Sequence, residues 1–107
     1  MATPASIPLI RTLPVNLLAR ATGAHPRTVE RWRAGTVPRR RQFTGRLAEL
    51  RGVLELLGPG LSRGAQTAWL NAKSGYLGGR RPIDLLAAGH VDQVRGAAIA
   101  YTGGEPT

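Results

Sequence analysis

Residues that could support catalysis or bind a metal are few in this sequence. His25 and His90 each lack a partner at metal-ligand spacing, and the chain has no cysteine. Asp84 and Asp92 lie on either side of a glycine turn, each in the first turn of an expected helix, where a carboxylate complements the helix dipole. The glycine-rich stretch 75–79 matches neither a dinucleotide-binding nor a phosphate-binding loop. We therefore expect no enzymatic activity, no cofactor and no metal site.

The chemistry that the sequence favours is binding of a polyanion by arginine. The formal net charge is +9, and residues 11–51 hold ten arginines and two glutamates, a net charge of +8. Residues 52–107 hold five basic and four acidic groups, a net charge of +1. A basic half of this kind indicates nucleic-acid binding. The run 39–41 (Arg-Arg-Arg) could contact phosphate oxygens, and a solvated charge run is the alternative.

Residues 15–34 have the pattern of two short helices joined by a sharp turn, which would position several of these arginines. Val29 and Trp32 share one face of the second helix and would pack it against the first. Arg27 and Arg31 then lie on the outer face, as in a helix that enters the major groove of DNA. An αα-hairpin with a solvated basic face is the alternative. The candidate DNA-binding residues are His25, Arg27, Thr28, Arg31, Arg33, Arg39, Arg40 and Arg41.

Composition predicts an all-α fold. The chain has 107 residues, 42% of them hydrophobic, and Phe43 is its only phenylalanine. Alanine and leucine dominate, which favours helix over sheet. Prolines at positions 4, 8 and 14 argue against a signal peptide or a membrane span in the first twenty residues. We therefore expect a cytoplasmic protein with no membrane partner.

Further helices are expected on both sides of a break at 58–60 (Gly-Pro-Gly). A continuous apolar seam over 42–57 predicts a long helix whose seam forms either core or a dimer contact. Helices are also expected over about 63–73, from Pro82 to Gly89, and over about 91–101. On the first of these, Ala65, Ala68, Trp69 and Ala72 share a face; on the last, Val91, Val94, Ala98 and Tyr101 do. Apolar residues among 7–13 could cover the first helix or reach a second protomer. We divide the chain into regions 1–60 and 61–107.

Two segments together resemble a known family. Residues 25–35 (HPRTVERWRAG) resemble the Xre-like helix-turn-helix of bacterial MbcA/ParS/Xre antitoxins. Residues 68–70 (AWL) and 79–86 (GRRPIDLL) look like the toxin-binding module of the same family. The resemblance covers roughly residues 14–101, and the pairing of both halves in this order makes it specific. It implies an N-terminal Xre-like helix-turn-helix followed by a small helical toxin-binding module.

The resemblance also implies a function. Such type II antitoxins neutralise a toxin with an RES domain, which consumes NAD or transfers ADP-ribose from it, and they repress their own operon. The expected partners are therefore an RES-domain toxin and double-stranded operator DNA, with the chain forming a homodimer or a hetero-oligomer with the toxin. The family places this module and the chain end against the toxin's active-site cleft. That implies toxin-binding residues at Trp69, Tyr76, Arg80, Arg81, Tyr101, Glu105 and Thr107.

Two other functions compete with this interpretation. A standalone phage or plasmid regulator would have the same helix-turn-helix but no toxin partner. A pure assembly protein would require the basic half to face an acidic protein instead of DNA. An RES-type reading frame next to this one would distinguish an antitoxin from a standalone regulator.

Overall fold

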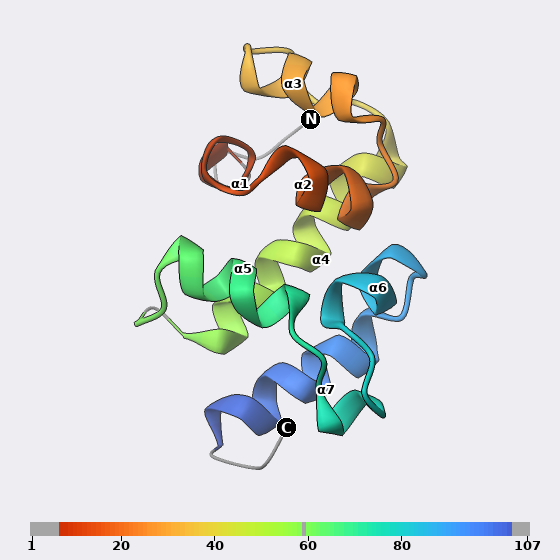
Figure 1. The fold of residues 1–107 in the computed structure, drawn as a ribbon. Coiled ribbons are helices and arrows are strands. Elements are labelled where there is room, and N and C mark those ends of the chain that lie inside the picture. The colour runs from red at the N-terminus through yellow and green to blue at the C-terminus, as the bar shows by residue number, and fades with distance from the viewer. Residues whose placement is uncertain (1–6, 59, 104–107) are drawn as a thin grey trace.

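The computed structural model describes residues 7–58 and 60–103, and their regular elements are all helical (Figure 1). In chain order these are α1 (Ile7–Thr12), α2 (Val15–Thr22), α3 (Pro26–Arg33), α4 (Arg41–Leu57), α5 (Arg63–Asn71), the 3-10 helix η2 (Gly75–Leu77), α6 (Pro82–Ala87) and α7 (Val91–Thr102). No β-strand occurs in the described ranges, where one isolated bridge joins Ser74 and Arg80. The all-α class is confirmed. Within the same ranges, no helix combines the length and hydropathy that crossing a membrane requires.

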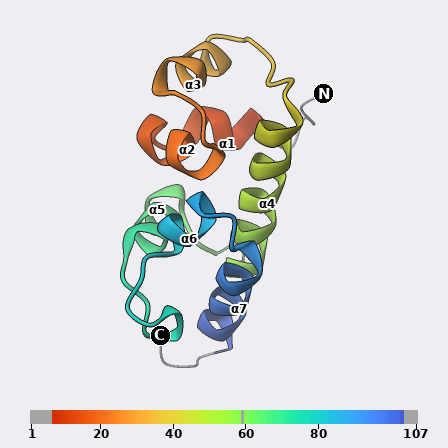
Figure 2. The same ribbon diagram turned by 90° about the vertical axis from the view of Figure 1, so that its right-hand side faces the viewer.

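Helices α1 to α3 form one end of the molecule, and α4 runs from that end along the other helices (Figure 2). Helix α2 ends at Gly23, whose φ of 79° is left-handed and whose backbone N–H donates to the carbonyl of Ala19. The turn 23–25 then leads into α3, which packs against α2. This agrees with the two-helix pattern expected for residues 15–34.

The start and the buried face of α3 follow from its sequence. His25 precedes the helix, and its Nδ1 accepts a hydrogen bond from the backbone N–H of Arg27 at 3.1 Å. Pro26 occupies the first helical position, where the missing N–H costs nothing. Val29 and Trp32 are buried, 0% and 6% exposed, so the helix is held by one face as predicted.

The apolar N-terminal segment is helical, and it covers this end of the molecule. Leu9, Ile10 and Leu13 of this segment are at most 4% exposed within the single chain, and α1 packs against α3. The covering role is therefore the correct one of the two alternatives for this segment.

The apolar seam of α4 forms core. Leu47, Leu50, Leu54 and Leu57 are at most 5% exposed, and Val53 joins them on the buried side. Helices α2 and α7 both pack against α4. Because the seam is already covered inside one chain, it is not available as a dimer contact.

In the second half, only part of each face outlined by the sequence is buried. On α5 the buried residues are Gln66 and Leu70, whereas Ala68 and Ala72 are exposed and Trp69 is half-buried. On α7, Val94 and Ala98 are buried, whereas Tyr101, one of the expected partner-binding residues, is 42% exposed. Burying Leu70 removes more apolar area from water than burying an alanine does, which favours the side of α5 that carries Leu70.

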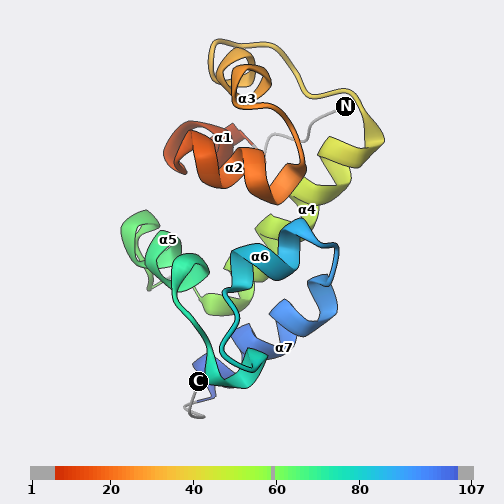
Figure 3. The same cartoon turned by 45° about the vertical axis from the view of Figure 1, so that its right-hand side comes forward.

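Helix α6 lies between α2 and α7 (Figure 3). The carboxylate of Asp84 on α6 accepts hydrogen bonds from Nε and Nη2 of Arg20 on α2, with an Nε distance of 2.9 Å. Arg46 of α4 donates to the carbonyl of Leu86 near the end of α6. Gly89, which ends this turn, has a φ of 88°, a left-handed conformation that favours glycine. These contacts tie the two ends of the molecule together.

Candidate DNA-binding and partner-binding surfaces

The outer face of α3 carries two arginines in a shallow hollow. Arg27, Glu30, Arg31 and Ala34 line a surface depression of about 360 Å³. Val29 and Trp32 hold the opposite face of the helix in the core. The expected division of α3 into a buried face and a basic outer face is thus present.

A second hollow lies between α3 and the start of α4. It has a volume of about 600 Å³, and its walls include Thr28, Arg39 and Arg40. Phe43 contacts residues on both sides of this hollow. Its ring lies edge-on to that of Trp32, with ring centroids 5.5 Å apart. The guanidinium carbon of Arg40 lies 5.8 Å from the centroid of the Phe43 ring. The aromatic contact brings the arginine run beside α3. Arg41 is exposed at the first position of α4.

Arg33 differs from the arginines of the outer face, because it is hydrogen-bonded to the backbone of another segment. Its Nε donates to the carbonyl of Ile10 at 3.0 Å, and its Nη2 donates to the carbonyls of Arg11 and Leu13 at 3.1 Å each. These carbonyls end α1 and begin the connection to α2, so the guanidinium caps a helix C-terminus. Arg33 therefore fastens α1 to α3. Spacing along α3 could not reveal this, because the acceptors lie 20 to 23 residues away in sequence.

An aromatic pair connects α5 and α7 at the other end of the molecule. The rings of Trp69 and Tyr101 meet edge to face, with centroids 6.3 Å apart and an interplanar angle of 65°. Tyr101 is 42% exposed and Trp69 is half-buried. The two predicted partner-binding aromatics are therefore adjacent and partly open to solvent.

Tyr76 and Ile99 extend the apolar surface of this half. Tyr76 of η2 is 50% exposed, and its hydroxyl lies where a Cβ on Gly96 of α7 would approach to 2.9 Å. Ile99 is 56% exposed on α7. Sequence reasoning missed Ile99, although it is the one large aliphatic side chain on this helix outside the face of Val91 and Val94.

The remaining predicted partner-binding residues fall into two groups. Arg80 and Arg81 are exposed, and each donates from Nε to a nearby backbone carbonyl, those of Leu77 and Asn71 respectively. These bonds hold the guanidinium groups close to the loop between α5 and α6. Glu105 and Thr107 lie outside the described residues.

The histidines and carboxylates of the described residues are dispersed over the structure. Within 7–58 and 60–103, no three histidine, aspartate, glutamate or cysteine side chains gather as metal ligands would. Asp84 is engaged by Arg20, and Asp92 lies in the first turn of α7. The two carboxylates thus take structural positions at helix starts.

Comparison with known proteins gives related sequences. No protein-family model matches the chain. It is 40% identical over 78 residues to the probable mycobacterial cidal antitoxin Rv3188 of Mycobacterium tuberculosis, covering 73% of this chain and 66% of that protein. It is 37% identical over 71 residues to the mycobacterial cidal antitoxin MbcA of Mycobacterium bovis and of M. tuberculosis, covering 66% of this chain and 63% of MbcA. The chain thus matches just under two thirds of the length of these curated relatives.

The fold is also similar to a solved structure over nearly its whole length. A chain in the crystal structure of the M. tuberculosis MbcT–MbcA toxin–antitoxin complex superposes with a TM-score of 0.73 and 29% identity. The match covers 94% of this chain and 93% of that one. The similarity of fold therefore includes both ends of the molecule.

Proposed function

Because the chain belongs to the family of MbcA-type antitoxins, we propose that it is the antitoxin of a type II toxin–antitoxin pair. Its partner would be an RES-domain toxin that consumes NAD or transfers ADP-ribose from it, and the chain would neutralise that toxin by covering its active site. The same chain would bind its operator DNA and repress the operon, as a homodimer or as a complex with the toxin. The observation that carries the proposal is the match of nearly the whole chain to a chain of a toxin–antitoxin complex.

The toxin-binding surface in this proposal is centred on Trp69 and Tyr101. Partly exposed aromatic side chains are favoured anchors of protein interfaces, because they remove much apolar area from water at little entropic cost. Tyr76 and Ile99 add large exposed apolar groups, and a surface of this kind is typical of an interaction site. The low net charge of residues 52–107 suits a protein partner better than DNA.

The DNA-binding surface in this proposal is the outer face of α3 with the arginine run beside it. Arg27 and Arg31 would contact base edges in the major groove, and Arg39 to Arg41 would contact phosphates. His25 and Thr28 lie at the start of the same helix and would contact the backbone of the duplex.

Toxin neutralisation is tested by co-expressing the full chain with the RES-type gene next to its own. The antitoxin should restore growth and keep cellular NAD at the level of cells without toxin. A toxin that remains lethal and depletes NAD when both proteins are present as soluble chains would contradict the proposal.

DNA binding is tested by gel shift on the upstream region of the operon. The Arg27→Ala/Arg31→Ala variant should lose discrimination between operator and unrelated DNA, by about 1–3 kcal/mol for each arginine that hydrogen-bonds a base edge. Replacing Arg39, Arg40 and Arg41 by alanine should instead weaken binding to all sequences alike and flatten the salt dependence. Unchanged shifts for both variants would exclude this surface.

A further inference from the structure

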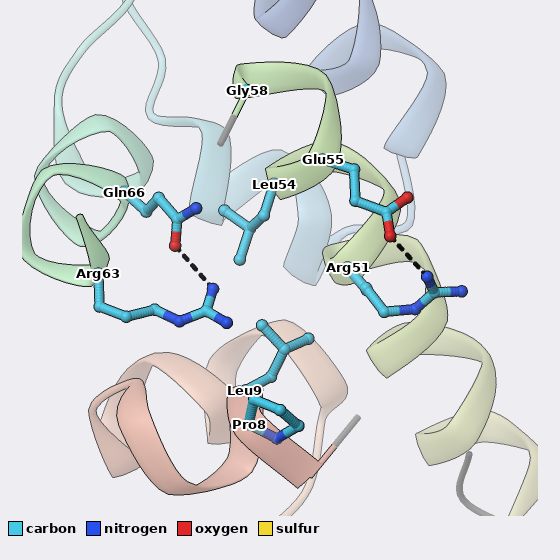
Figure 4. A pocket seen from close by; sticks show the side chains of 8 residues that line it. All are labelled: Pro8, Leu9, Arg51, Leu54, Glu55, Gly58, Arg63 and Gln66. Atoms are coloured by element: carbon cyan, nitrogen blue, oxygen red, sulfur yellow. Dashed lines mark hydrogen bonds and ion pairs between the residues drawn. The ribbon is translucent and has the colours of Figure 1, made fainter. Parts of the chain in front are cut away.

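A surface pocket lies where α1, α4 and α5 meet, and its lining residues are distinct from those of both surfaces described above (Figure 4). Its volume of about 370 Å³ is within the range of small-molecule sites. The space arises because α1 packs chiefly against α3, and α5 chiefly against α6, so neither fills the side of α4 that they flank.

The pocket has an apolar floor and a polar rim. Leu9 and Leu54, 2% and 3% exposed, form the floor. On one side of the rim, Nη1 of Arg51 donates to the Glu55 carboxylate at 2.7 Å. On the other side, Nη1 of Arg63 donates to Oε1 of Gln66 at 2.7 Å, and Figure 4 shows this guanidinium reaching toward the two leucines. A ligand that fits both parts needs an apolar body and a polar head.

The net charge of the rim determines which charge the polar head of the ligand should carry. Glu55 neutralises Arg51, whereas Arg63 has no carboxylate partner among the described residues, so the rim carries one uncompensated positive charge. Gln66 is only 7% exposed, and its fixed amide oxygen holds the Arg63 guanidinium in place before any ligand arrives. Nε of Arg51 is a second donor, buried and without an acceptor in the part of the chain that the structure describes.

We propose that this pocket binds a small-molecule monocarboxylate with an apolar body, whose carboxylate is held by Arg63 and whose body lies on Leu9 and Leu54. A guanidinium and a carboxylate can form two parallel charge-assisted hydrogen bonds, which suits Arg63, whose guanidinium has no carboxylate partner among the described residues. A doubly charged phosphate fits less well, because its second charge would face Glu55. The pocket shares no lining residue with the proposed toxin-binding and DNA-binding surfaces.

Octanoate is a suitable probe, and the full-length chain can be titrated with it by two-dimensional NMR. Saturable shifts are expected for the Leu9 and Leu54 methyl groups and for Nε–Hε of Arg63, whereas 1-octanol and acetate should bind at least about tenfold more weakly, since each lacks half of the recognition. Equal binding of octanoate and 1-octanol, or shifts spread over the whole surface, would overturn the proposal.

Three variants sharpen the test. Arg63→Gln keeps much of the side-chain length but should weaken octanoate binding about tenfold. Glu55→Gln frees Arg51 from its ion pair and should strengthen octanoate binding. Arg95→Gln removes an exposed arginine from α7 and should leave affinity unchanged. Amide spectra that match the wild type establish that each variant is folded. A folded Arg63→Gln variant with wild-type affinity for octanoate would show that Arg63 does not select the ligand. A Glu55→Gln variant that binds octanoate more weakly than wild type would contradict the role given to the rim charge.

Discussion

Arg31 and Arg33 lie two residues apart on α3 but have different surroundings. Arg31 faces the outer hollow, and Arg33 donates three hydrogen bonds to carbonyls at the end of α1. Arg33→Ala should therefore lower the free energy of unfolding by about 1–2 kcal/mol, while Arg31→Ala should change it by less than about 0.5 kcal/mol. Urea denaturation measures both values. Equal stabilities of the two variants would show that the hydrogen bonds of Arg33 contribute nothing to the fold.

The two tryptophans also differ in role. Trp32 is 6% exposed and contacts Phe43 in the core, so Trp32→Ala should cost about 3–5 kcal/mol of stability. Trp69 is half-buried, so Trp69→Ala should cost roughly half as much. Chemical denaturation followed by circular dichroism gives both numbers. A Trp32→Ala variant with the wild-type melting temperature but no DNA binding would place Trp32 on the DNA surface instead.

Glycines inside helices provide a matched pair of tests. A Cβ on Gly52 of α4 would meet nothing within 4 Å, so Gly52→Ala should stabilise the chain by about 0.5–1 kcal/mol through helix propensity. A Cβ on Gly96 of α7 would lie 2.9 Å from the Tyr76 hydroxyl and must displace that side chain. Gly96→Ala should therefore stabilise the chain less and alter the fluorescence or NMR signals of Tyr76. Identical stabilisation with an unchanged Tyr76 would contradict the observed proximity.

The sequence was sufficient to predict most helices, but not which helices pack together or which side chains pair over long sequence distances. The bounds of α2, α3 and α4 follow from Gly23, His25 and the leucine seam, because turn chemistry and periodicity are local. The buried side of α5 could not be predicted, because the covered side of an alanine-rich helix depends on α6, a distant element. For the same reason the pairs Arg20–Asp84 and Arg33–Ile10 could not be found from spacing. The exposed aromatics of the candidate partner surface were found because their number exceeds what short helices can bury.

The molecule should unfold as one unit, because α4 packs against α2 at one end and α7 at the other, and α6 joins α2 to α7. The variants Trp32→Phe and Trp69→Phe leave one tryptophan at either end as a fluorescent reporter. In each variant, the fluorescence of the remaining tryptophan should give the same denaturant midpoint as circular dichroism of the same sample. Two separated transitions within one variant would instead support regions 1–60 and 61–107 as independently folding units. Point variants are thus better than truncation for separating functions, since cutting after residue 60 would uncover the seam of α4.

Calorimetric titration of the full-length chain with its co-encoded toxin tests whether the aromatic surface or the basic surface contacts that partner. Trp69→Ala/Tyr101→Ala should weaken the affinity by at least about 30-fold, as expected when interface anchors worth about 2 kcal/mol or more are removed. Arg27→Gln/Arg31→Gln, at the opposite end, should leave the affinity within about twofold of wild type, while it abolishes operator discrimination. Wild-type affinity in the folded aromatic variant, together with abolished toxin binding in the arginine variant, would move the toxin-binding site to α3 and contradict the assignment of both surfaces.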